Sequence, residues 1–316
     1  MKLWITRPMT PAVEARAIQE FNAEIRETTT PLTHDEMTRA LSEFDMVVPT
    51  LGDQFGEQVF KDVPAPQCKL LANFGVGYNH IDVSAAQAVG IEVTNTPGAV
   101  TDATADVAMT LLLSTARRAG EGERLVRSGN WQGWHPTQML GHHVTGKRVG
   151  IVGMGRIGQA IARRCHFGFG MRVAYLARSA KRLDFAADFV PDILTLASAV
   201  DFLVVAVPGG AATRHLINAQ VLEAMKTSAI LVNIARGEVV DEAALISGLQ
   251  AGQIAGAGLD VYEFEPVVPN SLQDMENVTL LPHLGTATEE VRTSMGHMAL
   301  DNVAAFVQGR ALPNPV

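Results

Sequence analysis

The stretch Lys147-Arg-Val-Gly-Ile-Val-Gly-Met-Gly-Arg-Ile-Gly158 decides the fold. Its first half is apolar, as in a buried strand, and it ends in the pattern G-x-G-x-x-G at Gly153, Gly155 and Gly158. In such a turn the first glycine permits a tight bend, the second admits a pyrophosphate, and the third lets a helix pack closely on the strand. We therefore predict a strand, a phosphate-binding turn and a helix over Gln159–His166, as in a dinucleotide-binding unit.

An alternating series of apolar runs and longer stretches extends from this segment toward the C-terminus. The expected strands are Arg148–Val152, Arg172–Leu176, Asp201–Val207, Ala229–Ile234, Ile254–Leu259 and Val278–Leu281. Nearly continuous apolar strands are typical of a parallel sheet whose two faces are covered by helices. Six strands match the layout of a dinucleotide-binding domain.

The first third of the chain predicts a second parallel sheet, because short apolar runs again alternate with helical patterns. The expected strands are Lys2–Thr6, Ala23–Thr28, Asp45–Pro49, Leu70–Asn73 and Glu92–Thr94. Helices are expected over Thr10–Glu20 and Thr33–Leu41, and the second opens with a capping box from Thr33 to Glu36.

Two long helical patterns connect these series. Asp102–Arg118 is expected to link the domains, and Thr288–Gln308 to return to the first one, after which the chain ends without a strand of its own. Ser128–Thr145, rich in Gly, Trp and His, is expected to be an extended loop that packs on a partner subunit. We therefore expect an α/β chain of two doubly wound parallel-sheet domains. The expected boundaries are 1–99 plus 287–316 for the first domain and 100–286 for the second.

Composition narrows the function. The 316 residues carry 25 Lys and Arg against 33 Asp and Glu, a net charge of −8, which argues against nucleic acid as a partner. We find neither a signal peptide nor an apolar run near the ~20 residues of a membrane helix, so a soluble, cytoplasmic protein is expected. Cys68 and Cys165 suit a reducing compartment, and we expect both to be buried, with no metal site.

The end of the second strand in the C-terminal series bears on the cofactor. Enzymes built for NAD usually have Asp or Glu there to bind the ribose hydroxyls, but Ala177 takes this place, followed by Arg178 and Ser179. No carboxylate is present at this strand end to repel a 2′-phosphate, and Arg178 and Ser179 can bind one. We predict NADP over NAD, with NAD possible. The alternative is a solvated basic loop, with the preference set elsewhere.

Three polar residues follow three separate strands: Arg236, Glu265 and His283. A histidine paired with a carboxylate is held in one orientation, and it can protonate a carbonyl oxygen as hydride reaches the carbon. A nearby arginine can bind a carboxylate and polarise the adjacent ketone. Taken singly, these residues could also have purely structural roles. His283 could be a structural residue at a strand end, and Glu265 could be only a turn residue. Seven of the eight other histidines are expected in the extended loop (His135, His142, His143) or at surface or helix positions (His80, His166, His215, His297).

The chain resembles the D-isomer-specific 2-hydroxyacid dehydrogenases, and within them the glyoxylate/hydroxypyruvate reductases. The resemblance covers essentially the whole chain. The matching motifs besides the glycine turn are Asn73-Phe-Gly-Val-Gly-Tyr-Asn-His-Ile-Asp82, Asn95-Thr-Pro-Gly98, Asn233-Ile-Ala-Arg-Gly237, Gly258-Leu-Asp-Val-Tyr-Glu-Phe-Glu-Pro266 and Pro282-His-Leu-Gly285.

The resemblance implies a flavodoxin-like substrate domain, a Rossmann cofactor domain, a site in the cleft between them, and a homodimer formed mainly through the cofactor domains. It implies that Arg236 binds the substrate carboxylate and carbonyl, that His283 is the acid/base, and that Glu265 orients it. Backbone N–H groups of Val76 and Gly77 would also bind the carboxylate. Cofactor contacts are expected at Val76, Thr104, Gly153, Gly155, Arg156, Ile157, Gly158, Arg178, Ser179, Val207, Pro208, Thr213, Ile234, Asp260 and Gly285. Asp260 would face the nicotinamide amide, and Trp134 belongs to a loop expected to reach the partner's cleft.

The expected function is reduction of small 2-keto acids, glyoxylate or hydroxypyruvate, by NADPH. One alternative is a dehydrogenase for a larger substrate of the 2-ketogluconate or phenylpyruvate type, for which Leu51, Phe74 and Tyr78 would decide pocket size. Another is a cofactor-sensing binding protein, against which the lack of added basic segments argues.

Overall fold

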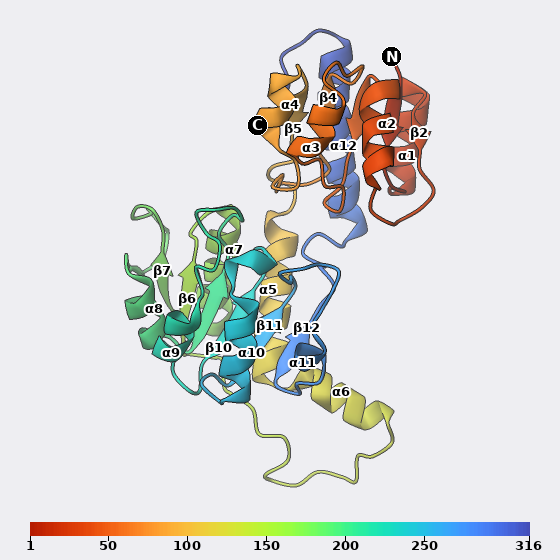
Figure 1. The fold of residues 1–316 in the computed structure, drawn as a ribbon. Coiled ribbons are helices and arrows are strands. Elements are labelled where there is room, and N and C mark those ends of the chain that lie inside the picture. The colour runs from red at the N-terminus through yellow and green to blue at the C-terminus, as the bar shows by residue number, and fades with distance from the viewer. The chain divides into compact units, whose positions relative to one another are not determined.

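The computed structural model describes residues 1–316 and contains two compact α/β units. The first unit joins Met1–Val100 to Thr286–Val316, and the second is Thr101–Gly285. Every strand pair in both sheets is parallel. The expected α/β class with two doubly wound parallel sheets is confirmed (Figure 1).

The first unit has a five-stranded sheet in the order β2-β1-β3-β4-β5. Its strands are β1 (Leu3–Ile5), β2 (Glu24–Ile25), β3 (Met46–Val48), β4 (Leu70–Ala72) and β5 (Glu92–Thr94). This is the flavodoxin-like order, in which the chain changes direction across the sheet between β1 and β3. Strands β1, β3 and β4 are buried throughout, which agrees with helices on both faces.

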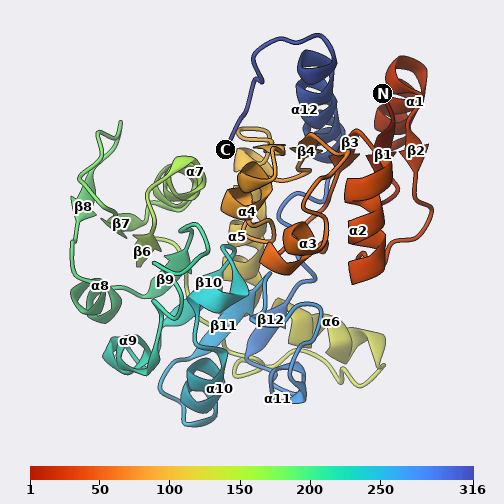
Figure 2. The ribbon, with the colours of Figure 1, turned by 45° about the horizontal axis from the view of Figure 1, so that its top comes forward.

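Two helix layers cover this sheet (Figure 2). One holds α1 (Pro11–Phe21) and α12 (Glu289–Val307); the other holds α2 (His34–Glu43), α3 (Glu57–Asp62) and α4 (Val83–Ala88). Ala299, Leu300 and Val303 of α12 share an apolar cluster with Val13 and β1. The chain's last helix therefore completes the core of the first unit. The capping box of α2 is confirmed, since Thr33 accepts from the Glu36 amide and Glu36 accepts from that of Thr33.

The second unit has a seven-stranded sheet in the order β12-β11-β10-β9-β6-β7-β8. The strands are β6 (Arg148–Val152), β7 (Arg172–Leu176), β8 (Ala187–Phe189), β9 (Phe202–Val205), β10 (Ile230–Asn233), β11 (Gly256–Leu259) and β12 (Val278–Leu280). The expected number of six was wrong, because β8 adds a seventh strand at the edge beside β7. This strand is short and partly exposed, so it lacks the apolar run that marks the others.

Helices cover both faces of this sheet as well (Figure 2). Its elements are α5 (Thr101–Ala116), α6 (Ala119–Arg127), α7 (Arg156–Arg163), a π-helical turn (Arg164–Gly168), α8 (Ile193–Ala199), α9 (Ala219–Ala224), a 3₁₀ turn (Gly237–Val239), α10 (Glu242–Gln250) and α11 (Asn270–Gln273). Residues of α5 and α7 form one buried cluster with the strands, and residues of α8, α9 and α10 form another. The cofactor-type sheet is thus doubly wound.

Two expected helices have different bounds. The helix expected over Asp102–Arg118 ends at Ala116, and α6 follows after Arg118, whose φ of +53° is left-handed. The helix expected from Gln159 begins at Arg156, directly after Gly155, and continues as the π-helical turn. The last residues form no strand, as expected, but Pro315 bridges to Thr94.

The expected extended loop Ser128–Thr145 is confirmed, since it contains no helix or strand. It and α6 extend away from the rest of the second unit (Figure 1). None of the α6 residues is buried, and Trp131 and Trp134 are 53% and 79% exposed. The expected burial of Cys68 and Cys165 is also confirmed. None of the helices has the length and apolar character needed to cross a membrane.

Candidate active site

The glycine turn after β6 has the geometry that its sequence predicts. Gly153 has a φ of +104°, and a Cβ there would lie 2.7 Å from the Ala206 carbonyl oxygen. A Cβ on Gly158 would lie 1.9 Å from the Gly153 carbonyl oxygen, whereas a Cβ on Gly155 would meet nothing within 4 Å. Gly153 and Gly158 are therefore required by the fold, and Gly155 faces open space.

The open space at Gly155 adjoins the N-terminus of α7. No side chain caps this helix, and the N–H groups of Arg156, Ile157 and Gly158 make no hydrogen bond within the chain. Such N–H groups and the helix dipole together bind phosphate. The turn therefore fits a dinucleotide pyrophosphate, because it combines free donors with the space in which a Cβ would stand.

The end of β7 carries no carboxylate. Ala177 is partly buried against the core, and Arg178 and Ser179 are exposed. The hydroxyl of Tyr175 in β7 accepts a 2.8 Å hydrogen bond from the Lys181 amide, so the loop after Ser179 folds back on the strand. The nearest acidic residue along this loop, Asp184, is paired with Arg163. The side chains of Arg178 and Ser179, both hydrogen-bond donors, therefore follow the strand end at which NAD-dependent enzymes usually carry a ribose-binding Asp or Glu.

His283 and Glu265 form a direct pair. The Nδ1 of His283 lies 2.9 Å from Oε2 of Glu265, and the other oxygen of Glu265 accepts from the Tyr262 amide at 3.0 Å. Burial raises the pKa of Glu265, but His283, the Tyr262 amide and the charge of Arg236 together hold that pKa below its ordinary value. The carboxylate is therefore kept ionised and fixed beside the imidazole. The other ring nitrogen of His283, Nε2, makes no hydrogen bond within the chain.

Arg236 stands on a turn that Asn233 builds. The Asn233 side chain donates to the Arg236 carbonyl and accepts from the Ala235 amide, both at 3.0 Å. Burial lowers the pKa of Arg236, while Glu265 and Glu238 oppose this shift. Arg236 is partly buried, and its guanidinium can bind an anionic group through charge-assisted hydrogen bonds.

Asp260 holds the segment that carries His283. Its carboxylate oxygens accept from the amides of Leu284 (2.6 Å) and Gly285 (2.9 Å), and its carbonyl accepts from the His283 amide. Burial raises the pKa of Asp260. These bonds hold His283 at a φ of +55°, in the left-handed region. Thr104 adds a hydrogen bond to the Gly285 carbonyl at 3.0 Å.

Two acidic residues that sequence reasoning missed support the same loops. Glu238 accepts from the Gly210 amide at 2.8 Å and so fixes the loop that contains Val207, Pro208 and Thr213. Glu263 accepts from Arg214 (2.9 Å) and His215 (2.8 Å), which ties the Glu265 loop to the segment before α9. His215 is therefore not a simple surface residue. Glu263 lies in a quoted motif, but its partners are about fifty residues away and carry no sequence signal.

The remaining expected residues lie in both units. In the second unit, Ile234 is buried after β10, and the Thr213 hydroxyl donates to the Pro208 carbonyl at 2.7 Å. In the first unit, Val76 and Gly77 form a turn after β4. The expectation of a surface position for His80 was wrong, since its side chain is buried and bonded to Asn73. This burial depends on contacts that the local pattern does not reveal.

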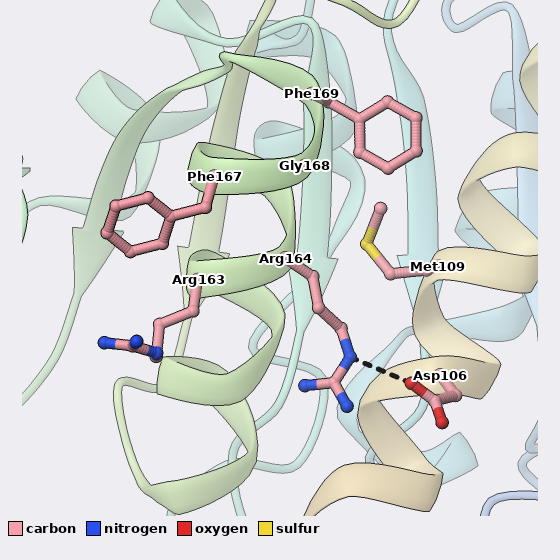
Figure 3. Close-up of a pocket in the computed structure, with 7 residues that line it drawn as sticks. All are labelled: Asp106, Met109, Arg163, Arg164, Phe167, Gly168 and Phe169. Carbon is pink, nitrogen blue, oxygen red and sulfur yellow. Dashed lines mark hydrogen bonds and ion pairs between the residues drawn. The ribbon is translucent and has the colours of Figure 1, made fainter.

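A surface hollow in the second unit is not part of this constellation. It measures about 540 Å³ and is lined by Asp106, Met109, Arg163, Arg164, Phe167, Gly168 and Phe169 (Figure 3). Arg164 pairs there with Asp106 at 2.8 Å and with Asp102 at 3.0 Å. These two aspartates join α5 to the end of α7, which agrees with a structural role for them.

The comparisons with known proteins agree with this geometry. Residues 109–285 match the family model "D-isomer specific 2-hydroxyacid dehydrogenase, NAD binding domain". The chain is 43% identical to a glyoxylate reductase of Pyrococcus horikoshii, covering 100% of this chain and 95% of that one. It is 36% identical to a glycerate dehydrogenase of Hyphomicrobium methylovorum, covering 98% and 96%. The chain belongs to the D-isomer specific 2-hydroxyacid dehydrogenases.

A solved structure supports the same assignment. The NADPH-dependent glyoxylate/hydroxypyruvate reductase of Sinorhizobium meliloti, in complex with NADP and malonate, is 37% identical and has a TM-score of 0.88. The alignment covers 100% of this chain and 96% of that one. The resemblance stated from the motifs is confirmed. This chain is therefore an oxidoreductase that uses a nicotinamide cofactor. The geometry of its glycine turn agrees with this assignment.

The first prediction separates the two glycine roles. Gly158→Ala is expected to lower the thermal unfolding temperature, because its Cβ would collide with the Gly153 carbonyl. Gly155→Ala is expected to leave that temperature nearly unchanged and to weaken NADPH binding, since its Cβ would occupy only open space. Calorimetric melting and NADPH titration by fluorescence measure the two effects. Equal destabilisation by both variants would contradict this division.

The second prediction concerns Glu265, whose folded-state pKa lies below its ordinary value of 4.5. A lowered carboxyl pKa stabilises the fold above the ordinary value, and this contribution disappears as the pH falls through the folded-state pKa. Glu265→Gln is therefore expected to lower the melting temperature near pH 7. The difference in melting temperature between this variant and wild type is expected to become smaller below about pH 4.5. Melting curves from pH 3 to 7, with the exposed Glu27→Gln as control, check this. A gap that stays constant with pH would refute the assignment.

Proposed function

We propose that this protein is a reductase that converts small 2-keto acids, glyoxylate and hydroxypyruvate, to 2-hydroxy acids with a preference for NADPH. The His283–Glu265 pair carries this proposal, because it supplies an oriented acid within the same compact unit as the dinucleotide turn. The names of the relatives, glyoxylate reductase and glyoxylate/hydroxypyruvate reductase, support the substrate class.

Each site residue has a role in this reaction. Arg236 binds the substrate carboxylate and polarises the adjacent carbonyl, and the N–H groups of Val76 and Gly77 bind the same carboxylate. A nicotinamide cofactor held at the glycine turn would supply the hydride that the carbonyl carbon receives. His283 donates the proton from Nε2 to the carbonyl oxygen, so a carbonyl becomes a hydroxyl. Glu265 accepts from Nδ1 and stabilises the protonated ring before this transfer.

The preference for NADPH rests on Ala177, Arg178 and Ser179. The exposed guanidinium and hydroxyl can bind a 2′-phosphate, and the missing carboxylate removes the usual partner of the NAD ribose. The Sinorhizobium meliloti relative, which is NADPH-dependent, supports the same choice. Contacts by the other expected cofactor residues, with Asp260 toward the nicotinamide amide, belong to this proposal. Asp260 retains accepting capacity beyond its two backbone hydrogen bonds.

We also propose a homodimer formed through the second unit. Val126, Trp131, Trp134 and Leu140 are 53–79% exposed along α6 and the loop Ser128–Thr145. A set of large apolar side chains on an extended segment is typical of a surface that another chain covers. Trp134 would reach the partner's site. The two free, buried cysteines suit the cytoplasm as the compartment.

The third prediction tests the reaction. Wild type is expected to oxidise NADPH rapidly with glyoxylate or hydroxypyruvate, measured as initial rates at 340 nm, with pyruvate as a third substrate. His283→Gln is expected to lower kcat by about a hundredfold or more, because the general acid is lost, while NADPH binding is retained. Near-normal turnover in this variant would remove His283 from the mechanism. No turnover by wild type with any of the three would favour a larger keto acid or a cofactor-sensing protein.

The fourth prediction tests the choice of cofactor. Arg178→Ala is expected to raise the KM for NADPH by about tenfold, the size of one lost charged hydrogen bond, and to leave the KM for NADH nearly unchanged. Arg182→Ala, which removes an exposed cation from the same loop, is the matched control. Equal effects of Arg178→Ala on both cofactors would place the 2′-phosphate elsewhere.

A further inference from the structure

The turn after β4 is built by two asparagine side chains. The Nδ2 of Asn73 donates to the carbonyl oxygens of Gly75 (3.1 Å) and Gly77 (3.0 Å), and the Nδ2 of Asn95 donates to that of Val76 (2.9 Å). Asn73 and Asn95 directly follow Ala72 and Thr94, which are register partners in β4 and β5. Sheet register therefore places the two amides side by side, where they bind three successive carbonyls.

These hydrogen bonds fix the direction of three N–H groups. The peptide bonds here are trans, and in a trans peptide the C=O and N–H point in opposite directions. With the carbonyls of residues 75, 76 and 77 facing the asparagines, the N–H groups of Val76, Gly77 and Tyr78 point away from them. None of the three donates to another group of the chain. Consecutive outward N–H groups in a turn form a concavity that binds anions.

His80 is compatible with the donating orientation of Asn73. Asn73 is fully buried, and its Oδ1 lies 3.0 Å from Nε2 of His80, which is 4% exposed. With Nε2 protonated, the imidazole donates to Oδ1 and leaves both hydrogens of Nδ2 for the two carbonyls. The reversed amide would place Oδ1 against two carbonyl oxygens. The two carbonyls therefore set the donating orientation, and His80 supports it when Nε2 carries the proton.

We infer that Asn73, Asn95 and His80 are positioning residues that turn the N–H groups of Val76, Gly77 and Tyr78 toward the substrate carboxylate. This inference rests on the proposed function and adds the Tyr78 amide as a third donor. The residues act through the backbone and touch neither the carbonyl carbon nor the transferred proton. Since the carboxylate changes little during reduction, the lost contacts weaken substrate and transition state alike. Their loss therefore raises KM and leaves kcat in place.

The test replaces each amide by a carboxylate of the same shape. In Asn73→Asp and Asn95→Asp, an oxygen replaces the donating Nδ2 and repels the carbonyls. The KM for glyoxylate is expected to rise about tenfold or more in each variant, in line with the loss of oriented donors, with kcat and NADPH affinity within about twofold of wild type. Titration of the enzyme–NADPH complex with the unreactive carboxylate oxamate should show the same loss of affinity. His80→Leu should give a smaller rise in KM.

Asn302→Asp is the matched control. Asn302 is equally buried in the same unit, where its Nδ2 donates to the Met298 carbonyl and its Oδ1 accepts from the Asn314 amide. It is expected to leave the KM for glyoxylate unchanged. Should Asn73→Asp fail to fold, as judged by melting, the less buried Asn95→Asp carries the test.

The outcomes distinguish this inference from the proposed function. An active wild type whose Asn73 and Asn95 variants keep the wild-type KM and oxamate affinity would overturn the inference alone. The inference would also be overturned if the Asn73 and Asn95 variants lowered kcat without changing KM. It would be overturned as well if Asn302→Asp raised the KM for glyoxylate to the same extent. A wild type that neither reduces a keto acid nor binds oxamate would overturn the proposed function, and the inference with it.

Discussion

The parallel register of β10, β11 and β12 is the constraint on which the candidate active site depends. Asn233 lies opposite Leu259, and Leu259 opposite Leu280, so the three strands end at one level. Arg236, Glu265 and His283 follow these ends and arrive at the same edge of the sheet. An open parallel sheet places its site at such an edge, because every strand delivers its following loop there.

Close backbone packing then sets the spacing of these loops. A Cβ on Gly237 would lie 1.8 Å from the Tyr262 carbonyl carbon, so the turn that carries Arg236 presses directly on the loop that carries Glu265. The side chain of Tyr262 continues this chain of contacts, since its hydroxyl donates to the Leu281 carbonyl at 2.9 Å, two residues before His283. Burial raises the pKa of the Tyr262 hydroxyl, which keeps it a neutral donor. These contacts join the three site loops to one another.

Both units contain backbone N–H groups that make no hydrogen bond within the chain, and we have proposed that both sets bind an anion. In the second unit the N-terminus of α7 leaves three N–H groups free, and the helix itself orients them. In the first unit no helix follows Val76 directly, so side-chain amides do the orienting. Side-chain amides suit this task, since they bind carbonyls without adding a charge that would repel or trap the anion.

The sequence by itself determined the α/β class, most strand positions, the glycine turn, and the positions of Arg236, Glu265 and His283 after three strand ends. It could do so because strand periodicity, special glycines and strand-end polar residues are local signals. It missed β8, a short exposed edge strand, and the break at Arg118. Only the tertiary structure decided the burial of His80, the contacts of Glu238 and Glu263, and the double hydrogen bond of Asp260 to Leu284 and Gly285. Those contacts join residues whose pairing depends on how loops from different strands pack, and no local pattern encodes that packing.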